Sequence, residues 1–196
     1  PIHEIHHALG AKMIPFAGWE MPVWYSSVLK EHHATRESAG LFDVSHMGVY
    51  QVEGQRAETF LESVVANDMA SLSVGESLYT HLLDPEGRVL DDTMVYRRGE
   101  QAYLMVVNAA NDDKVWAWLQ AVRDGQVRVD LERPGSEVYG RGCSIRDLRD
   151  PIEGDHMRVD LALQGPKSRD ILLALGCADR DAARLKALPW AGLMEG

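Results

Sequence analysis

The segment Val-Leu-Asp-Asp-Thr-Met-Val-Tyr, residues 89–96, is the part of the sequence that decides the predicted fold. It is rich in β-branched and aromatic residues, and a second run of this kind, residues 102–107, follows a short connection. The two runs therefore predict an antiparallel hairpin. A third strand, residues 77–83, precedes them across the turn Asp-Pro-Glu-Gly at 84–87, whose glycine can supply a positive φ angle.

Helical patterns lie on either side of these strands. Within residues 54–66 the apolar positions recur at intervals of three and four, which gives one apolar stripe. A second helix is predicted over residues 111–122, and strands over 48–53 and 127–131. The resulting order is strand, helix, strands, helix, strand. This order predicts an α+β fold in which antiparallel sheets carry their helices on one face.

The two ends of the chain are less regular. Residues 1–25 predict short turns and extended pieces, followed by a helix over 27–39 that Ser26 or Ser27 caps and Gly40 ends. Residues 133–155 are interpreted as a surface excursion, after which a strand at 159–163 and two further helices are expected. The predicted domains are a discontinuous first lobe, 1–47 with about 132–196, and a second lobe, 48–131. The first lobe looks truncated at its end.

Composition excludes several classes of function. The 196 residues carry a formal net charge of −10, which disfavours general binding to nucleic acid or anionic membranes. No apolar run reaches the roughly 20 residues that a membrane span requires. A cytoplasmic protein is expected, and Cys143 and Cys177 are then best interpreted as reduced thiols.

Asp91 and Asp92 interrupt an apolar strand, where aspartate is disfavoured. Successive strand side chains point to opposite faces, so Asp92 shares a face with Met94 and Tyr96, and Asp91 lies on the other. A buried carboxylate needs a partner, which a ligand with N–H groups or a cationic amine would supply. The alternative is that both carboxylates face solvent at a strand end or bulge.

Other polar motifs favour structural interpretations. Residues 43–48, Asp-Val-Ser-His-Met-Gly, are interpreted as a hydrogen-bonded network in preference to a nucleophile triad. The histidines at positions 3, 6 and 7 have a spacing compatible with metal binding on a helix, but no carboxylate or cysteine cluster completes it. The sequence therefore predicts no metal site.

A polar pocket near the hairpin is the remaining candidate site. Tyr79 and Tyr96 lie on predicted strands and can stack on a flat ring. The Asn108 amide both donates and accepts hydrogen bonds, which suits the edge of a heterocycle, although it can equally cap the following helix.

Several ordered motifs resemble the tetrahydrofolate-dependent aminomethyltransferase family, which includes the T-protein of the glycine cleavage system. The resemblance covers most of residues 1–131 and resumes near 159. The motifs that carry it are Gly10-Ala11-Lys12-Met13, residues 15–23, Arg36 with residues 40–48, Asn67-Asp68, Leu90-Asp91-Asp92, residues 106–111 with Lys114, and Leu163-Gln164-Gly165-Pro166.

The resemblance implies two intertwined lobes of a folate-binding fold and a one-carbon transfer to tetrahydrofolate. In this family an aminomethyl group on the lipoyl arm of the H-protein is passed on, ammonia is released, and methylenetetrahydrofolate forms. Asp92 matches the family carboxylate that positions the folate amine and supports it electrostatically. By the same matching, the side chains that would line the folate cavity are Met47, Tyr79, Met94, Tyr96 and Asn108.

The chain also departs from the family pattern. Glu86-Gly87-Arg88 stands where Gly-Gly is usual, and residues 133–155 are longer and more charged than expected. The C-terminal β-barrel of the family is absent from this chain, so association with a missing C-terminal half is expected. Two alternatives stay open: a tetrahydrofolate-dependent demethylase of a small methylated donor, and a non-catalytic folate-binding regulatory protein. A eukaryotic source would imply the mitochondrial matrix.

Overall fold

The computed structural model describes residues 2–133, 140–176 and 179–195. The chain forms two compact units, each built from two stretches of sequence. The hairpin unit comprises residues up to His46 together with Val159–Leu188, and the sheet unit comprises Met47–Arg158 together with Pro189–Glu195. Within the described ranges, no helix is both long enough and apolar enough to span a bilayer.

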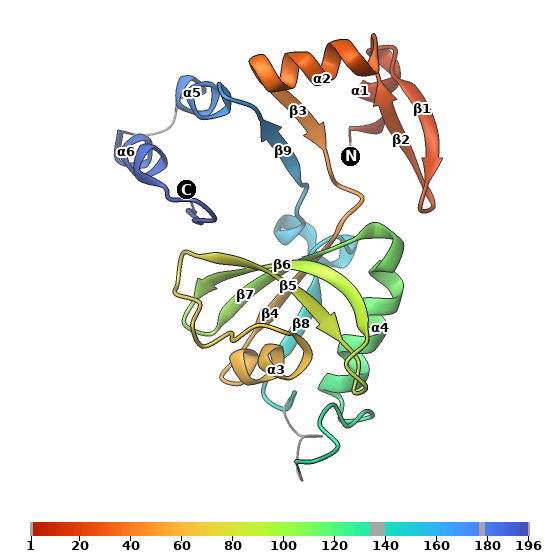
Figure 1. Cartoon of the computed structure of the whole chain (residues 1–196), viewed down its shortest axis with the longest axis vertical. Coiled ribbons are helices and arrows are strands. Elements are labelled where there is room, and N and C mark those ends of the chain that lie inside the picture. Colours follow the sequence, from red (N-terminus) through yellow and green to blue (C-terminus); the bar gives the residue numbers. More distant parts are fainter. Residues whose placement is uncertain (1, 134–139, 177–178, 196) are drawn as a thin grey trace. The chain divides into compact units, whose positions relative to one another are not determined.

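The sheet unit contains a five-stranded antiparallel sheet in the order β5-β6-β7-β4-β8 (Figure 1). Its strands are β4 (Gly48–Glu53), β5 (Ser77–Leu83), β6 (Val89–Gly99), β7 (Ala102–Val107) and β8 (Ser144–Asp147). Its helices are α3 (Ala57–Val64), α4 (Asp112–Arg123) and two short 3-10 segments, η1 (Ala109–Asn111) and η3 (Pro151–His156). The α+β fold with antiparallel sheets is thus confirmed.

Both helices pack on the same face of this sheet. Alternate residues of each strand point toward them, as the pleat of a strand requires. The fully buried hydrophobic side chains of this layer include Tyr50, Val52, Phe60, Leu61, Leu82, Val95, Tyr103, Met105, Val107, Val115 and Leu119. The apolar stripe predicted within residues 54–66 is therefore the face of α3 that forms this core.

The prediction of a strand at residues 127–131 is wrong. Val127 and Val129 pack against the core as partly buried side chains, but no strand forms there. The sheet is completed instead by β8, which lies inside the segment interpreted as a surface excursion and pairs with β4. The described part of residues 132–158 therefore belongs to the sheet unit, whereas the sequence placed it in the first lobe.

The outer edge of β5 is covered at its start by residues 189–195, and residues 65–66 pair with its other end. Ser77 donates hydrogen bonds from its backbone nitrogen and its hydroxyl to the Ala191 carbonyl, both at 2.9 Å. The Leu193 nitrogen donates to the Gly75 carbonyl at 2.6 Å. Edge groups that would otherwise be unpaired are thereby satisfied. Trp190, in this segment, is 98% exposed.

The hairpin unit is built from short elements. They are α1 (His3–Ala8), β1 (Lys12–Phe16), β2 (Trp19–Trp24), α2 (Val28–Glu37), β3 (Gly40–Asp43), β9 (Leu161–Gln164), α5 (Ser168–Ala174) and α6 (Asp179–Ala187). β1 pairs with β2 and β3 with β9, both antiparallel. Helix α1 was not expected from the sequence. Among the described residues of this unit, no hydrophobic side chain is buried.

The ends of α2 differ from the prediction. Ser27 is the N-cap residue, but its side chain makes no capping bond. The Glu31 carboxylate accepts hydrogen bonds from the backbone nitrogens of Tyr25, Ser26 and Ser27 instead. Gly40 does not end the helix, because it begins β3. A Cβ at Gly40 would clash with the Thr35 hydroxyl, so this glycine permits a close approach.

Cys143 is a free, partly buried thiol, and burial raises its pKa to about 11. A thiol with this pKa stays protonated and is a weak nucleophile near neutral pH. Cys177 lies outside the described residues.

Replacing Phe60 by alanine tests the role of the α3 stripe. Phe60 is fully buried in the core, so Phe60→Ala is expected to lower the free energy of unfolding by about 3–5 kcal/mol. The neighbouring Thr59 is less buried, and Thr59→Ala should change it by less than about 0.5 kcal/mol. Urea denaturation followed by circular dichroism measures both. Equal effects would show that α3 does not anchor the core.

Candidate functional site

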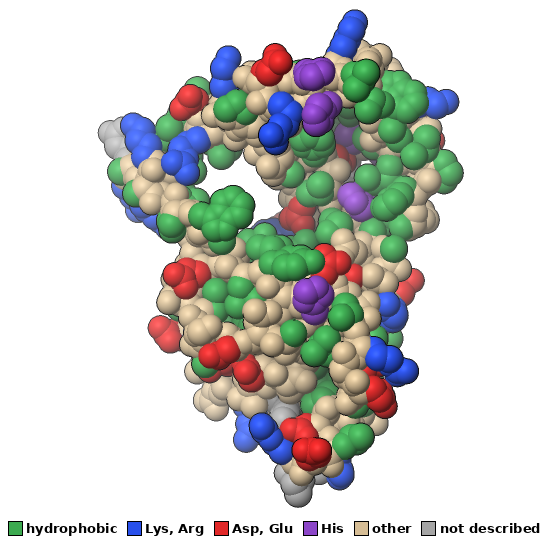
Figure 2. All heavy atoms as spheres, viewed as in Figure 1, with side chains coloured by type: hydrophobic (Ala, Val, Ile, Leu, Met, Phe, Trp, Pro, Cys, Tyr) green, Lys and Arg blue, Asp and Glu red, His purple; other side chains and the backbone are tan. Residues whose placement is uncertain are grey.

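The second face of the sheet, opposite α3 and α4, carries the predicted site. Antiparallel pairing places Tyr79 opposite Met94 and His81 opposite Asp92. Met94 also pairs with Val106, and Tyr96 with Leu104. Residues directly opposite each other in a ladder share a face. Over β5 and β6, Figure 2 shows hydrophobic side chains gathered beside acidic and histidine side chains.

Asp92 is exposed and held by two neighbours. The Tyr79 hydroxyl donates to its Oδ2 at 3.1 Å. The Asn108 side-chain amide nitrogen lies 3.0 Å from the Asp92 Oδ1 and 3.0 Å from the Asp92 backbone carbonyl, and the two amide hydrogens are shared among these acceptors and Asp91. Each carboxylate oxygen therefore has one protein donor and retains capacity to accept a further hydrogen bond. The carboxylate is fixed in direction while remaining accessible.

Asp91 has a different role. It is only 3% exposed and accepts hydrogen bonds from the Asn108 backbone nitrogen at 2.9 Å and side-chain amide at 3.0 Å. The Asn111 amide donates to the same carboxylate at 2.5 Å. The partner expected for an inward carboxylate is thus supplied by the protein itself. Asn108 does not cap the helical segment that follows it, because its side chain bonds the two aspartates.

The apolar part of the second face adjoins Asp92. Met94 and Tyr96 follow it at two-residue intervals on β6, and both are partly buried. Met47 is partly buried immediately before β4, and its carbonyl accepts a hydrogen bond from the Arg149 guanidinium. Hydrogen bonds therefore join Asp92 directly to Tyr79 and Asn108. Met94 and Tyr96 lie near Asp92 because they share its face of β6.

His81 belongs to the same face but was missed in the sequence. It lies opposite Asp92 in the ladder, and its ring centroid is 5.4 Å from that of Tyr79 with an interplanar angle of 76°. The available signal was the two-residue interval between Tyr79 and His81, which puts both side chains on one face of a strand.

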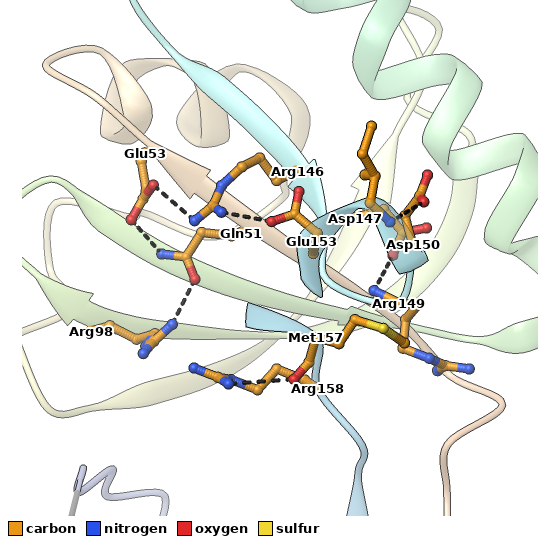
Figure 3. Close-up of polar contacts among 11 residues, drawn as sticks. Gln51, Glu53, Arg98, Arg146, Asp147, Arg149, Asp150, Glu153, Met157 and Arg158 are labelled. Atoms are coloured by element: carbon orange, nitrogen blue, oxygen red, sulfur yellow. Dashed lines mark hydrogen bonds and ion pairs between the residues drawn. The ribbon is translucent and has the colours of Figure 1, made fainter. Parts of the chain in front are cut away.

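The part of the second face over β4 and β8, away from β5 and β6, is strongly polar (Figure 3). Gln51 is 3% exposed, accepts a hydrogen bond from Arg98 at 2.6 Å and donates one to Glu53 at 2.9 Å. Arg146 forms ion pairs with Glu53 and Glu153 at 3.5 and 2.7 Å. A cleft of about 310 Å³ opens beside these residues. Carboxylates pair with Arg98 and Arg146, so it is not a purely cationic site.

Within the motif at residues 43–48, Asp43 is the centre of a hydrogen-bonded network. Asp43 accepts a hydrogen bond from His6 Nε2 at 2.9 Å, and His6 Nδ1 bonds the Tyr25 hydroxyl at 2.7 Å. The Ser45 backbone nitrogen donates to the other Asp43 oxygen at 2.9 Å. Burial raises the pKa of Asp43, whereas the hydrogen bonds from His6 and Ser45 lower it. The hydrogen bonds have the larger combined effect, so this pKa lies below its ordinary value.

The electrostatics of Tyr79 depend on Asp92. The hydrogen bond to the Asp92 carboxylate raises the pKa of the Tyr79 hydroxyl above its ordinary value of 10.0. The cause is that a phenolate beside a carboxylate would lose this bond and be repelled. Tyr79 therefore remains a donor across the physiological pH range.

The fold and site define a class of protein: an α+β domain with an exposed carboxylate, fixed by a phenol and an amide, at the edge of an apolar sheet face. Residues 2–195 match the family model described as the GCVT N-terminal domain. The chain belongs to this family.

Named relatives agree with the family match. The chain is 44% identical to a protein named aminomethyltransferase from Symbiobacterium thermophilum, over 89% of this chain and 42% of that protein. It is 38% identical to the Bacillus subtilis aminomethyltransferase, over 95% of this chain and 45% of that protein. The chain thus spans less than half the length of these relatives.

A solved structure is also similar. The crystal structure of glycine cleavage system aminomethyltransferase T from Bartonella henselae matches with a TM-score of 0.75 and 36% identity. The match covers 92% of this chain and 44% of the other. The fold therefore extends across most of the chain.

The two aspartates of β6 should differ in their effect on stability. Asp91→Ala would leave the Asn108 and Asn111 donors without their buried acceptor, and should lower the free energy of unfolding by at least about 2 kcal/mol. Asp92 is exposed, so Asp92→Ala should change it by less than about 0.5 kcal/mol. Denaturant titrations of the two variants provide the comparison. A larger loss for Asp92→Ala would contradict the assignment.

The pKa of Tyr79 should respond to Asp92. Asp92→Asn removes the carboxylate that raises this pKa, so the hydroxyl should ionise at a lower pH than in the unchanged protein. Spectrophotometric titration of tyrosinate measures the shift, and Tyr79→Phe identifies the component that belongs to Tyr79. An unchanged titration curve would show that the hydrogen bond is not formed in solution.

Proposed function

We propose that this chain carries the folate-side part of a tetrahydrofolate-dependent aminomethyltransferase, the T-protein activity of a glycine cleavage system. The observation that supports it most is the exposed Asp92 carboxylate, fixed by Tyr79 and Asn108 beside the apolar side chains of β6. Asp92 and Asn108 also lie within motifs that resemble those of the family. The relatives above bear the name of this activity.

The chemistry of these residues fits a reduced pterin. The pyrimidine half of such a ring system is flat and carries N–H donors along one edge, and a carboxylate such as Asp92 accepts hydrogen bonds from donors of this kind. Asn108 provides an amide next to that carboxylate, and Met94 and Tyr96 provide apolar surface for the ring. In this proposal Met47, just before β4, also contacts the folate. Apart from Asp92, the side chains of this group are uncharged, which suits contact with a neutral ring.

In the proposed mechanism Asp92 acts by position and charge. The bonds from Tyr79 and Asn108 hold the carboxylate in one orientation, so little reorganisation is required when a ligand amine approaches. A carboxylate in this place stabilises positive charge that develops on that amine during attack. Tetrahydrofolate, when bound, supplies the amine that takes up the one-carbon unit.

The proposed partner is a lipoylated H-protein, whose arm presents the aminomethyl group. The similar Bartonella henselae protein is named as the aminomethyltransferase T of a glycine cleavage system, which supports this choice of partner. Since the chain spans less than half of its relatives, we propose that the complete site also includes residues from the remaining part of such a protein. We propose in addition that this chain forms the two-lobed, folate-binding arrangement of the family.

Asp92→Asn tests the function directly. Asparagine preserves the shape but removes the negative charge, so transfer from aminomethylated H-protein should fall at least about 100-fold. Tetrahydrofolate binding, followed by calorimetry, should persist with a Kd changed less than about tenfold, which corresponds to about 1.4 kcal/mol. Both measurements use the complete polypeptide.

Asp124→Asn is the matched control, because Asp124 is an exposed aspartate just beyond the end of α4. It should leave binding and transfer unchanged. Full activity of Asp92→Asn would refute the role given to Asp92. Folate binding combined with turnover of a small methylated donor, and none with H-protein, would favour the demethylase instead. Binding without any turnover would favour a regulatory protein.

A further inference from the structure

Three side chains of the hairpin unit bring potential metal ligands together. His3 and His7 are four residues apart on α1, so their side chains lie on one face of the helix. Glu20 projects from β2, where it pairs with Pro15 of β1. One ligand atom from each of the three residues lies within 4.8 Å of the others. Among the described residues, it is at this cluster that three histidine, cysteine or carboxylate ligand atoms come this close together.

The distances are compatible with a tetrahedral ion. Zinc binds nitrogen and oxygen at about 2.0–2.2 Å, which places two ligands of a tetrahedron about 3.3 Å apart. Glu20 Oε2 lies 2.8 Å from His3 Nε2 and 3.5 Å from His7 Nε2. The centroids of the two imidazole rings are 4.7 Å apart and the angle between the ring planes is 73°, so the rings meet edge to face and are not stacked. Small rotations of exposed side chains would equalise these distances.

An ion can reach these ligands from solvent. The side chains of His3, His7 and Glu20 are 46%, 45% and 52% exposed. Two imidazoles and one carboxylate form a ligand set that zinc uses in proteins, with water in the fourth position. His6 does not compete for the ion, because it is buried and bonded to Asp43 and Tyr25.

The sequence around these ligands has a spacing found in zinc proteins. Residues 3–7, His-Glu-Ile-His-His, fit the pattern H-E-x-x-H, in which two histidines four residues apart on a helix bind zinc. In that pattern the glutamate acts as a general base. Here the Glu4 side chain is 93% exposed and lies outside any enclosed site, so the inference concerns binding alone.

We propose that His3, His7 and Glu20 form a zinc-binding site that links α1 to the β1–β2 hairpin. The sequence predicted no metal site, and this proposal replaces that prediction, because folding supplies the carboxylate that the histidine run was expected to lack. A bound ion would join an N-terminal helix that has no side-chain cap to a strand of the adjacent hairpin. Without the ion, Glu20 bonds His3, so zinc has to replace that contact.

Calorimetric titration of the untagged full chain with zinc chloride tests this inference. We expect saturable binding of one ion per chain. His7→Ala and Glu20→Gln should each weaken binding at least about tenfold, since each removes one of three protein ligands. Glu20→Gln keeps the size of the side chain and a hydrogen-bonding group for His3, so it tests ligation apart from folding. Circular dichroism should show both variants folded.

The histidine pair on α2 provides a matched control. His32 and His33 are exposed, with ring centroids 5.6 Å apart, but they are adjacent in sequence and have no carboxylate in ligand reach among the described residues. Histidine side chains are visible over α2 in Figure 2. The double variant His32→Ala, His33→Ala should bind zinc as the unchanged chain does.

Cobalt substitution provides a second readout. Co²⁺ at a four-coordinate site with nitrogen and oxygen ligands has visible absorption bands that hexaaqua cobalt lacks, and His7→Ala should abolish them. The proposal would be overturned by a folded chain that binds no zinc saturably. It would equally be overturned if binding survived His7→Ala and Glu20→Gln unchanged, or was lost only in the His32 and His33 variant.

Discussion

Two adjacent carboxylates on β6 must point in opposite directions, and the arrangement of the sheet unit depends on this constraint. Asp91 is directed into the helix layer, where it accepts hydrogen bonds from Asn108 and Asn111 and so joins β6 to the start of α4. Asp92 is directed to the second face, where the same Asn108 amide contacts it. One asparagine thus links a buried structural carboxylate to an exposed one on the proposed site.

This linkage explains why the site lies at the junction of sheet and helix. The Lys114 ammonium, in the first turn of α4, donates to the Leu90 carbonyl at 2.7 Å and to the Asn111 side chain at 2.8 Å. Lys114 thus helps to hold Asn111. Asn111 and Asn108 together supply the donors that the buried Asp91 carboxyl group requires. The orientation of Asp92 is consequently determined by the helix layer behind it as well as by its own strand.

Strands rich in apolar and β-forming residues could be predicted from sequence, whereas alternation alone misled at residues 127–131 and the short, polar strand β8 gave no signal. Residues 77–83 and 102–107 were predicted with the bounds that the structure shows, because both runs are rich in apolar and β-forming residues. β8 was missed because Ser-Ile-Arg-Asp contains one buried residue, Ile145. The face shared by Asp92, Met94 and Tyr96 follows from parity alone, whereas the bond between Tyr79 and Asp92 depends on a register that one strand does not reveal. Glu20 escaped notice as a ligand because its proximity to His3 arises only when the hairpin folds back.

The pairing of β4 with β8 has a consequence for synthesis of the protein. Tyr50 on β4 finds its partner Asp147 only after almost the entire sheet unit has been made, and Gly40 on β3 waits still longer for Gln164. A nascent chain emerging from the ribosome therefore carries two strand edges with unpaired backbone groups, of the kind that promote association between chains. Contacts so distant in sequence also slow folding. The same topology that gives the finished sheet its fifth strand leaves the growing chain exposed to wrong pairing until its last strands emerge.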